Sequence, residues 1–240
     1  MKSLREFTPA RVDLGRTGHS LPTRELLDFQ LAHARARDAV HQPMDAHSLM
    51  IELKQKSIPC VTLASEAGDR ATYLHRPDLG RRLNAESRER LAPLKSDYEA
   101  VFVIADGLSA LAVHRHAVPL LELVLRKLDW NIAPLTIVEQ GRVAVGDEIG
   151  ELLGAKLTVV LIGERPGLSS PDSLGIYLTW QPRPGRTDAE RNCISNIRAE
   201  GLSYELAAHK LLFLMNESRR LKLSGVQLKE RARLLPDSGV

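Results

Sequence analysis

The hydrophobic pattern of the chain changes at about residue 97, and this change constrains the fold more than any other feature. Before it, apolar residues recur three and four positions apart, as on one face of a helix. After it, short runs such as Ala100 to Ala105 (AVFVIA) and Leu157 to Ile162 (LTVVLI) are apolar at every position. Continuous apolar strands are typical of a parallel sheet that helices cover on both faces. The second part of the chain is therefore predicted to be α/β.

Strands and helices alternate in this second part. The expected strands are Ala100 to Ala105, Pro134 to Val138, Leu157 to Ile162 and Leu174 to Trp180. Three helices are expected. The first covers Leu111 to Leu128, the second is a segment that carries Ile149, Leu152 and Leu153, and the third covers Ser203 to Leu223 and is ended by Gly225. A strand, a glycine turn and a helix in succession predict a Rossmann-like, mostly parallel sheet flanked by helices. We assign this domain to residues 97–240.

Residues 1–96 are predicted to form a mainly helical region. Helices are expected from Thr23 as the N-cap to about Asp38, from Asp45 to Lys56, and from Pro77 to about Leu91. Leu26, Leu27 and Leu31 form an apolar stripe on the first helix. Val61 to Ala64 and Ala71 to Leu74 flank a turn-like segment and predict a small hairpin. The first 24 residues are basic and rich in turn-formers, which is typical of an arm that orders on a partner.

Composition excludes several classes of protein. Only two cysteines occur in 240 residues, so a disulfide scaffold is excluded and Cys60 and Cys193 are expected to be free thiols. A formal charge of +3 and ten aromatic residues give no basis for nucleic-acid binding. No segment approaches the roughly 20 apolar residues of a membrane helix, and the first residues lack the apolar core of a signal peptide. We therefore expect a cytoplasmic protein.

Glycine-bearing loops follow three of the expected strands. They are Asp106 to Ser109, Gly141 to Val143 and Gly163 to Gly167. The carboxyl ends of parallel strands meet at one edge of a sheet, where ligands bind in open α/β folds. A purely structural interpretation stays open, because any strand-to-helix turn favours glycine. Three such loops at one edge nevertheless make a ligand site a reasonable hypothesis.

The familiar catalytic motifs are missing from these loops. The sequence has no G-x-G-x-x-G and no G-x-S-x-G. Gly141 and Gly146 have P-loop spacing, but Asp147 and Glu148 stand where lysine and a hydroxyl residue should follow and would repel a triphosphate. His114 and His116 fall inside an expected helix and are interpreted as structural. No metal site and no catalytic residue is assigned, and the chain is predicted to bind a bulky ligand.

Eight segments in order resemble the small subunit of ethanolamine ammonia-lyase. They are Leu14 to Gly18, Leu26 to Val40, Tyr73 to Leu83 (YLHRPDLGRRL), Asp106 to Ser109, Gln140 to Val143, Asp147 to Ala155, Gly163 to Leu168 (GERPGL) and Arg191 to Ile197 (RNCISNI). The resemblance extends from about residue 10 to residue 230. Any one segment alone is a weak signal, whereas eight with compatible spacing are specific.

The resemblance implies part of an adenosylcobalamin enzyme. That family converts ethanolamine to acetaldehyde and ammonia by radical chemistry, in a complex of several large and small chains. Its large subunit is a TIM barrel that holds the substrate and most catalytic groups, and the small subunit helps to enclose the cobalamin. Residues 1–96 are then expected to contact the large subunit, and residues 97–240 to bind the cofactor. This division of labour explains a chain without its own acid, base or nucleophile.

Three cofactor contacts are implied by the matching motifs: Val143, Glu164 and Cys193. The Glu164 carboxylate suits the primary amides of cobalamin, whose N–H groups it accepts. Val143 is expected to offer backbone polar groups and apolar contact. Cys193 has the character of a small packing residue and is not assigned as a cobalt ligand. The D-x-H-x-x-G motif of other cobalamin folds is absent, since Asp45 to Met50 lacks its glycine, which favours base-on binding.

An alternative of another class is a stand-alone nucleotide-binding or regulatory α/β module. It accounts for the sheet and the glycine turns but not for eight ordered segments. Longer family members carry an N-terminal extension, which in some is associated with a bacterial microcompartment. Because the shared region begins at about residue 10 here, a dispersed cytoplasmic enzyme is at least as strongly expected as packaging.

Overall fold

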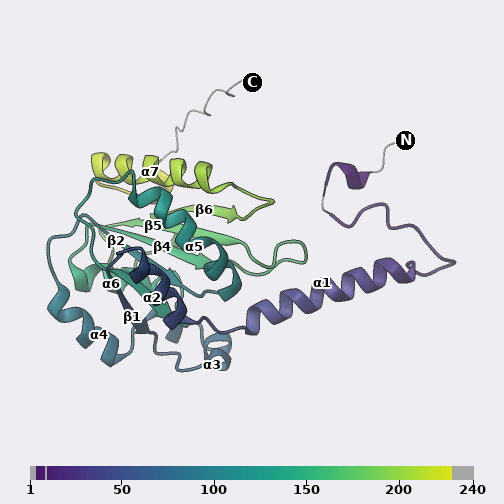
Figure 1. The fold of residues 1–240 in the computed structure, drawn as a ribbon, viewed down its shortest axis with the longest axis horizontal. Coiled ribbons are helices and arrows are strands. Elements are labelled where there is room, and N and C mark those ends of the chain that lie inside the picture. Colours follow the sequence, from purple (N-terminus) through teal and green to yellow (C-terminus); the bar gives the residue numbers. More distant parts are fainter. Residues whose placement is uncertain (1–3, 9, 229–240) are drawn as a thin grey trace, which may run out of the picture.

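The computed structural model describes residues 4–8 and 10–228, which form a six-stranded sheet with helices on both faces (Figure 1). The strands are β1 (Cys60–Ala64), β2 (Ala100–Ala105), β3 (Leu135–Glu139), β4 (Leu157–Gly163), β5 (Leu174–Trp180) and β6 (Arg191–Ile197). Their order is β1-β3-β2-β4-β5-β6. The first four are parallel, and β5 and β6 are antiparallel to their neighbours. The prediction of an α/β fold is confirmed.

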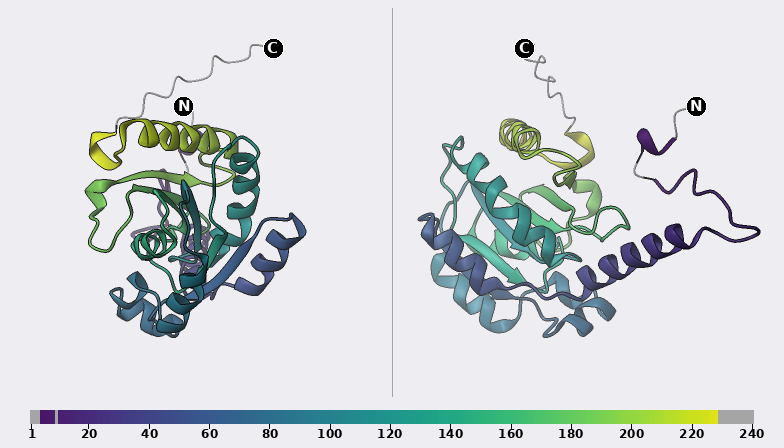
Figure 2. Two further views of the ribbon diagram at one scale, coloured as in Figure 1. Left: turned by 90° about the vertical axis from the view of Figure 1, so that its left-hand side faces the viewer. Right: turned by 45° about the vertical axis from the view of Figure 1, so that its right-hand side comes forward.

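The described residues contain seven α-helices. They are α1 (Thr23–His41), α2 (Ala46–Gln55), α3 (Arg70–His75), α4 (Ala85–Leu91), α5 (Ala110–Leu125), α6 (Val145–Leu153) and α7 (Tyr204–Leu221). Short 3-10 segments are η1 (Leu4–Glu6), η2 (Leu79–Arg81), η3 (Ala92–Leu94), η4 (Asp188–Glu190) and η5 (Gly225–Gln227). One face of the sheet packs against α2, α5 and α7, and the other against α4 and α6 (Figure 2). None of the described helices is long and apolar enough to cross a membrane.

The chain leaves β2 and β3 toward opposite faces of the sheet. After β2 it enters α5, and after β3 it enters α6, which returns across β2 to β4. Loops that diverge in this way open a crevice at the carboxyl ends of the strands, where α/β proteins bind ligands. The loops after β2 and β4 also touch, since the Leu108 N–H donates to Gly163 O at 2.9 Å.

Helix α6 lies unusually close to the sheet because two glycines, one turn apart, face β4. A Cβ on Gly146 would lie 2.4 Å from Val160 Cγ2, and one on Gly150 would lie 2.3 Å from Pro182 Cγ. No side chain fits at such distances, so glycine is required at both positions. The N-terminus of α6 is thereby fixed against the strands that carry the candidate site.

The predicted hairpin at residues 61–74 is wrong. Val61 to Ala64 belongs to β1, which pairs with β3 in the parallel sheet, and Ala71 to Leu74 belongs to α3. The Asp69 carboxylate accepts a hydrogen bond from the Thr72 N–H at 2.7 Å, so the turn-like residues start a helix. The sheet therefore includes residues on both sides of residue 97.

The helix expected from Pro77 is divided. A 3-10 turn, η2, is followed by an extended residue, Arg82, and then by α4. Asn84 caps α4 by accepting from the Ser87 N–H at 2.8 Å. Because the Asn84 side chain accepts a hydrogen bond from the backbone, it favours the start of a new helix at this position over continuation of η2. The helix expected over Asp45 to Lys56 is confirmed as α2 with Asp45 as its N-cap.

Strand β6 carries no continuous apolar run, and the sequence did not predict it. Only Arg191, Ile194 and Ile197 are buried, of which the two isoleucines join the core, whereas Cys193 and Ser195 are exposed. The strand is half-buried because helix α7 covers one of its faces. The opposite face of β6, on the α6 side of the sheet, is open.

Helix α1 extends away from the sheet rather than packing on it (Figure 1). Its N-cap residue is Pro22, so Thr23 is not the expected cap, and no side chain caps it. Leu26, Leu27 and Leu31 are 43%, 57% and 50% exposed, and within the helix only Ala39 is buried. The apolar stripe predicted from the sequence therefore exists, but it covers no core of this chain.

Candidate functional site

Asp106 ties together the loops that follow β2 and β3. Its buried carboxylate accepts hydrogen bonds from the N–H groups of Gly141 and Gln140, at 2.9 and 3.0 Å. Arg70 Nη1 lies 3.2 Å from Asp106 Oδ2 and completes the cluster. Burial raises the pKa of Asp106 to about 6, against the opposing effect of the Arg70 guanidinium. Asp106 is an anchor of the strand-end loops rather than a group that faces a ligand.

The loop after β3 is held in place by Arg70 and Arg142, which both stack on the ring of Tyr73. The guanidinium carbons of Arg70 and Arg142 lie 4.7 and 4.2 Å from the centre of its ring. The Tyr73 hydroxyl donates to Gly141 O at 3.2 Å, and the Arg142 N–H donates to Gly80 O at 2.7 Å. Cation–π contact and these bonds fix the chain just before α6.

Val143 lies at this fixed position, next to the first turn of α6. It is half-buried and packs against the core cluster on the α6 face of the sheet. Val143 also lines a cavity of about 800 Å³ beside the helix N-terminus. The residue expected to contact a cofactor therefore borders open space.

Glu164 follows β4 and reaches across the ends of β5 and β6. Its Oε2 accepts hydrogen bonds from the Ser173 hydroxyl and, at 3.1 Å, from the Asn196 N–H. Its side chain passes so near Gly175 that a Cβ there would lie 3.0 Å from Oε1. Within the part of the chain that the structure describes, Oε1 has no hydrogen-bond partner. One oxygen is used to orient the carboxylate and the other is left to accept from a ligand.

Cys193 lies in the middle of β6, opposite Tyr177 of β5. The thiol is exposed, with Sγ 3.1 Å from Ser195 Oγ. The prediction that Cys193 is a small buried packing residue is wrong, because its thiol is exposed. Burial, together with the neighbouring Cys193 and Glu164, raises the pKa of Tyr177. Tyr177 pairs with Cys193 across the two strands, and Glu164 lies over Gly175, two residues before Tyr177, so the two expected contact residues lie close to one another.

These residues form what we call the open strip, on the α6 side of β5 and β6. It consists of Glu164, Gly175, Tyr177, Cys193 and Ser195. Val143 packs against the same core cluster as Tyr177, so all three sequence-predicted residues lie on one face of the sheet. Gly175 is buried under the Glu164 side chain, and the exposed members Cys193 and Ser195 have small side chains. Such a surface suits a broad, flat ligand that a second chain covers.

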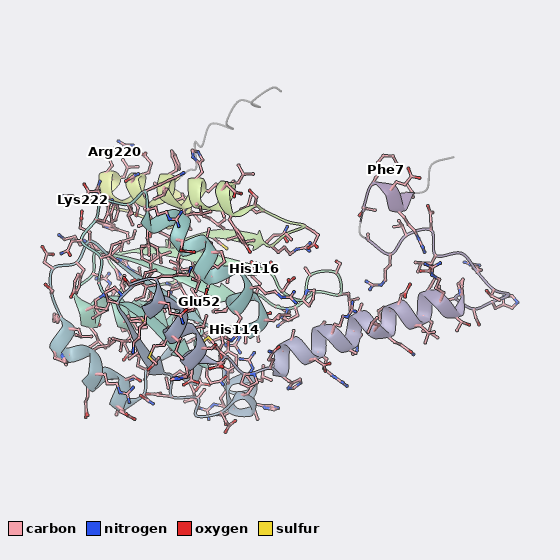
Figure 3. All side chains as sticks on the ribbon, in the orientation of Figure 1. Phe7, Glu52, His114, His116, Arg220 and Lys222 are labelled. Atoms are coloured by element: carbon pink, nitrogen blue, oxygen red, sulfur yellow. The ribbon has the colours of Figure 1, made fainter. Side chains whose placement is uncertain are left out.

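The two histidines of α5 lie on the other face of the sheet (Figure 3). His114 Nε2 accepts from the Asp45 N–H at 3.1 Å, and His116 Nδ1 lies 2.7 Å from the Tyr204 hydroxyl. Burial lowers the pKa of both rings. Ser109 caps α5 through the Ala112 N–H. The histidines thus have structural partners, and no group of three or more metal-ligating side chains occurs among residues 4–8 and 10–228.

Comparison with known proteins identifies the relatives of this chain. A sequence model of the ethanolamine ammonia-lyase light chain (EutC) matches residues 1–229. The chain belongs to the ethanolamine ammonia-lyase light-chain family. The ethanolamine ammonia-lyase small subunit of Azotobacter vinelandii is 59% identical over 238 residues, which cover 96% of this chain and 88% of that protein.

Other relatives agree with this assignment. The small subunit of Pseudomonas aeruginosa is 59% identical over 236 residues, covering 95% of this chain and 86% of the relative. That of Pseudomonas fluorescens is 57% identical over 238 residues, covering 96% and 87%. The resemblance seen in eight segments is confirmed over nearly the whole chain. As a light chain of an ammonia-lyase, it forms part of an enzyme and implies a large-subunit partner.

For this light chain, sequence reasoning missed Tyr177, Gly175 and Ser195 as site residues. Their sheet positions depend on the antiparallel pairing of β5 with β6, which no local pattern specifies. A signal was present in Gly175-Ile176-Tyr177-Leu178-Thr179, where small or polar residues alternate with aliphatic ones. That alternation indicates a strand with one face less covered than the other.

Proposed function

We propose that this chain binds adenosylcobalamin on the open strip and, with a large subunit, encloses it. The large subunit would hold ethanolamine, which the complex converts to acetaldehyde and ammonia by radical chemistry. The observation that carries the proposal is that Val143, Glu164 and Cys193 lie on the same face of the sheet, which at Cys193 is exposed. Residues far apart in the sequence share this face, and no group of three or more metal-ligating side chains occurs in the described part of the chain.

The residues present fit a corrinoid. The corrin ring is broad and flat and carries primary amides around its edge. The free Oε1 of Glu164 is an acceptor for an amide N–H, and the Ser173 and Asn196 bonds hold it in place. Gly175 is covered by the Glu164 side chain, whereas the small side chains of Cys193 and Ser195 are exposed and let a flat group approach β6. Adenosylcobalamin, when bound, supplies the radical chemistry, and this chain binds, orients and shields it from water.

The proposal extends to the architecture. The unit from β2 to β4 resembles a Rossmann-like domain in its parallel strands, and Val143 and Glu164 follow the carboxyl ends of β3 and β4, whereas Tyr177 and Cys193 lie on the face of the antiparallel strands β5 and β6. Residues 97–240 would form the cobalamin-binding domain, of which residues 229–240 lie outside the described part. Residues 1–96 would contact the large subunit in a complex of several large and small chains. We place this complex in the cytoplasm, either dispersed or within a bacterial microcompartment.

Binding to the assembled complex tests the proposal through Glu164. Glu164→Ala is expected to weaken adenosylcobalamin binding roughly ten- to a hundredfold, since a charge-assisted bond contributes about 1.5 to 3 kcal/mol. Glu164→Gln keeps an acceptor and should lose less. The cofactor dissociation constant is measured by absorbance titration, with circular dichroism to verify the fold. An unchanged constant in both variants would contradict the assignment of Glu164.

Activity supplies the second test. The chain alone, with adenosylcobalamin and ethanolamine, should release no ammonia above background, because it assembles no catalytic constellation of its own. Addition of the large subunit should produce acetaldehyde and ammonia. Turnover by the chain alone would exclude a role restricted to holding the cofactor.

A further inference from the structure

The cavity beside the N-terminus of α6 is rich in arginine. It has a volume of about 800 Å³ and lies between η2, the first turn of α6 and the loop from β5 to β6. Its charged lining residues are Arg81, Arg82, Arg88, Arg142, Arg186 and Arg191, with Asp147, Glu148 and Asp188. Positive charge therefore exceeds negative charge around this space.

The two carboxylates of α6 are already paired. Asp147 accepts two hydrogen bonds from Arg191, at 2.7 and 2.6 Å. Glu148 lies 2.6 Å from Arg88 Nε and also accepts from the Leu83 N–H at 2.8 Å. From the sequence, Asp147 and Glu148 were expected to repel a phosphate here. Their pairing removes most of that repulsion.

Among the residues that the structure describes, no carboxylate pairs with three of the cavity's arginines. The guanidinium groups of Arg81 and Arg82 make no hydrogen bond or ion pair with any described residue. Arg142 is held against Tyr73 by its stacked guanidinium and by an Nη2 bond to Tyr73 O at 3.2 Å. Its Nε is buried and has no hydrogen-bond partner within residues 4–8 and 10–228. An anion in the cavity could therefore pair with Arg81 and Arg82, and with Arg142, whose guanidinium is already held in place by Tyr73.

The start of α6 adds donors to these charges. No side chain caps the helix, whose N-cap is Ala144. Among the described residues, no acceptor faces the N–H groups of Val143 and Ala144, and both residues line the cavity. The first N–H groups within α6, those of Val145, Gly146 and Asp147, already donate to the carbonyl oxygens of Arg142, Val143 and Ala144. The available donors are therefore the N–H groups of Val143 and Ala144, which lie at the positive end of the helix dipole. This arrangement favours a negatively charged oxygen.

We propose that this cavity binds a phosphate anion, and that in the assembled enzyme the anion is the phosphodiester of the nucleotide loop of cobalamin. The inference rests on the proposed cofactor. Val143 connects the two sites, because it borders the cavity and packs with Tyr177 of the open strip on one core cluster. The corrin would lie on the strip, and the single negative charge of the phosphodiester would lie between Arg81, Arg82 and Arg142.

Comparison of two corrinoids tests this inference. Adenosylcobinamide has the corrin ring but lacks the phosphate, the ribose and the base, so it should not use the cavity. In the large–small complex, the double variant Arg81→Gln, Arg82→Gln should bind adenosylcobalamin about tenfold or more weakly, since two charge-assisted contacts are lost. Its affinity for adenosylcobinamide should equal that of the wild type. Arg183→Gln is the matched control, because Arg183 is exposed in the same loop region but does not line the cavity.

Each outcome has a distinct meaning. An equal loss for both corrinoids, or no loss for either, would overturn this inference alone. A wild-type complex that binds neither corrinoid would overturn the proposed function and the inference with it. Competition by millimolar inorganic phosphate against adenosylcobalamin, but not against adenosylcobinamide, is expected for a phosphodiester site. A variant that loses only its affinity for the large subunit would show that the arginines bind that protein instead.

Discussion

Arg191, the first residue of β6, holds Asp147 of α6 in a buried bidentate ion pair. The side chains are 3% and 2% exposed, and the same guanidinium donates to Thr179 Oγ1 and Arg186 O, both at 2.9 Å. The pair thus fixes the first turn of α6 against the strands of the open strip. Val143 stands four residues before Asp147, and Cys193 stands two residues after Arg191. One buried interaction positions both sides of the candidate site.

Loss of one partner of this pair should be costly. Asp147→Ala leaves a buried guanidinium without its counter-charge, for which a destabilisation of about 3 to 5 kcal/mol is expected. Glu86→Ala is the matched control, since its ion pair with Arg90 is exposed and should contribute less than about 1 kcal/mol. Urea unfolding of both variants measures the difference. Equal losses would show that the Arg191 pair does not stabilise the fold.

The anchor Asp106 predicts a pH dependence of stability. Its pKa is about 6 in the folded chain and 3.8 in a free carboxyl group, so the folded state binds more protons between these values. The free energy of unfolding of the wild type, relative to Asp106→Asn, should therefore fall as pH rises from about 4 to 6, by at most about 3 kcal/mol. Above that window the difference should be constant. Denaturant titrations at several pH values test this, and a difference that rises through the window would contradict it.

The two thiols should differ in reactivity and in protection. Cys193 is exposed on the open strip, whereas Cys60 is half-buried, its pKa is raised by burial, and it donates to Met50 O at 4.0 Å. Iodoacetamide is expected to label Cys193 first, because the thiolate is the reactive form. In the large–small complex, adenosylcobalamin at about ten times its Kd should slow labelling of Cys193 about tenfold. Cys60 is the internal control, and equal labelling of Cys193 with and without cofactor would remove it from the site.

Sequence patterns predicted β2, β3, β4 and β5 because their runs are apolar and lie inside the sheet. They also predicted a strand at Val61 to Ala64, within β1, but paired it wrongly in a hairpin, and they missed β6; these two strands form the edges of the sheet and are only partly buried. An edge strand is specified by its pairing with distant residues, which periodicity does not encode. The same limit applies to the site. Val143, Glu164 and Cys193 came from a family resemblance, and only the pairing of β5 with β6 shows that Tyr177 lies beside two of them.

Helix α1 and the segment before it are expected to bind the large subunit. Leu4 and Phe7 are 57% and 72% exposed, and Arg5 pairs with Glu25 of α1 rather than with the sheet. Deletion of residues 1–22, of which 1–3 and 9 lie outside the described residues, should leave the sheet folded and lower the affinity for the large chain. A truncated chain that assembles normally at nanomolar concentration would show that this arm is dispensable. The interface would then have to lie on the sheet domain.

Two substitutions in α1 distinguish the loss of an apolar contact with the large subunit from the addition of a negative charge. Leu27 is 57% exposed, so Leu27→Glu should barely change the thermal unfolding of the free chain. If the large subunit covers this leucine, a charge there forfeits about 1.5 to 3 kcal/mol of apolar burial, equivalent to roughly ten- to a hundredfold in affinity. Gln30→Glu adds the same charge at an exposed polar position of the same helix and should have little effect. Size-exclusion chromatography with the large subunit measures assembly, and equal behaviour of the two variants would mean that the apolar stripe of α1 is not the contact.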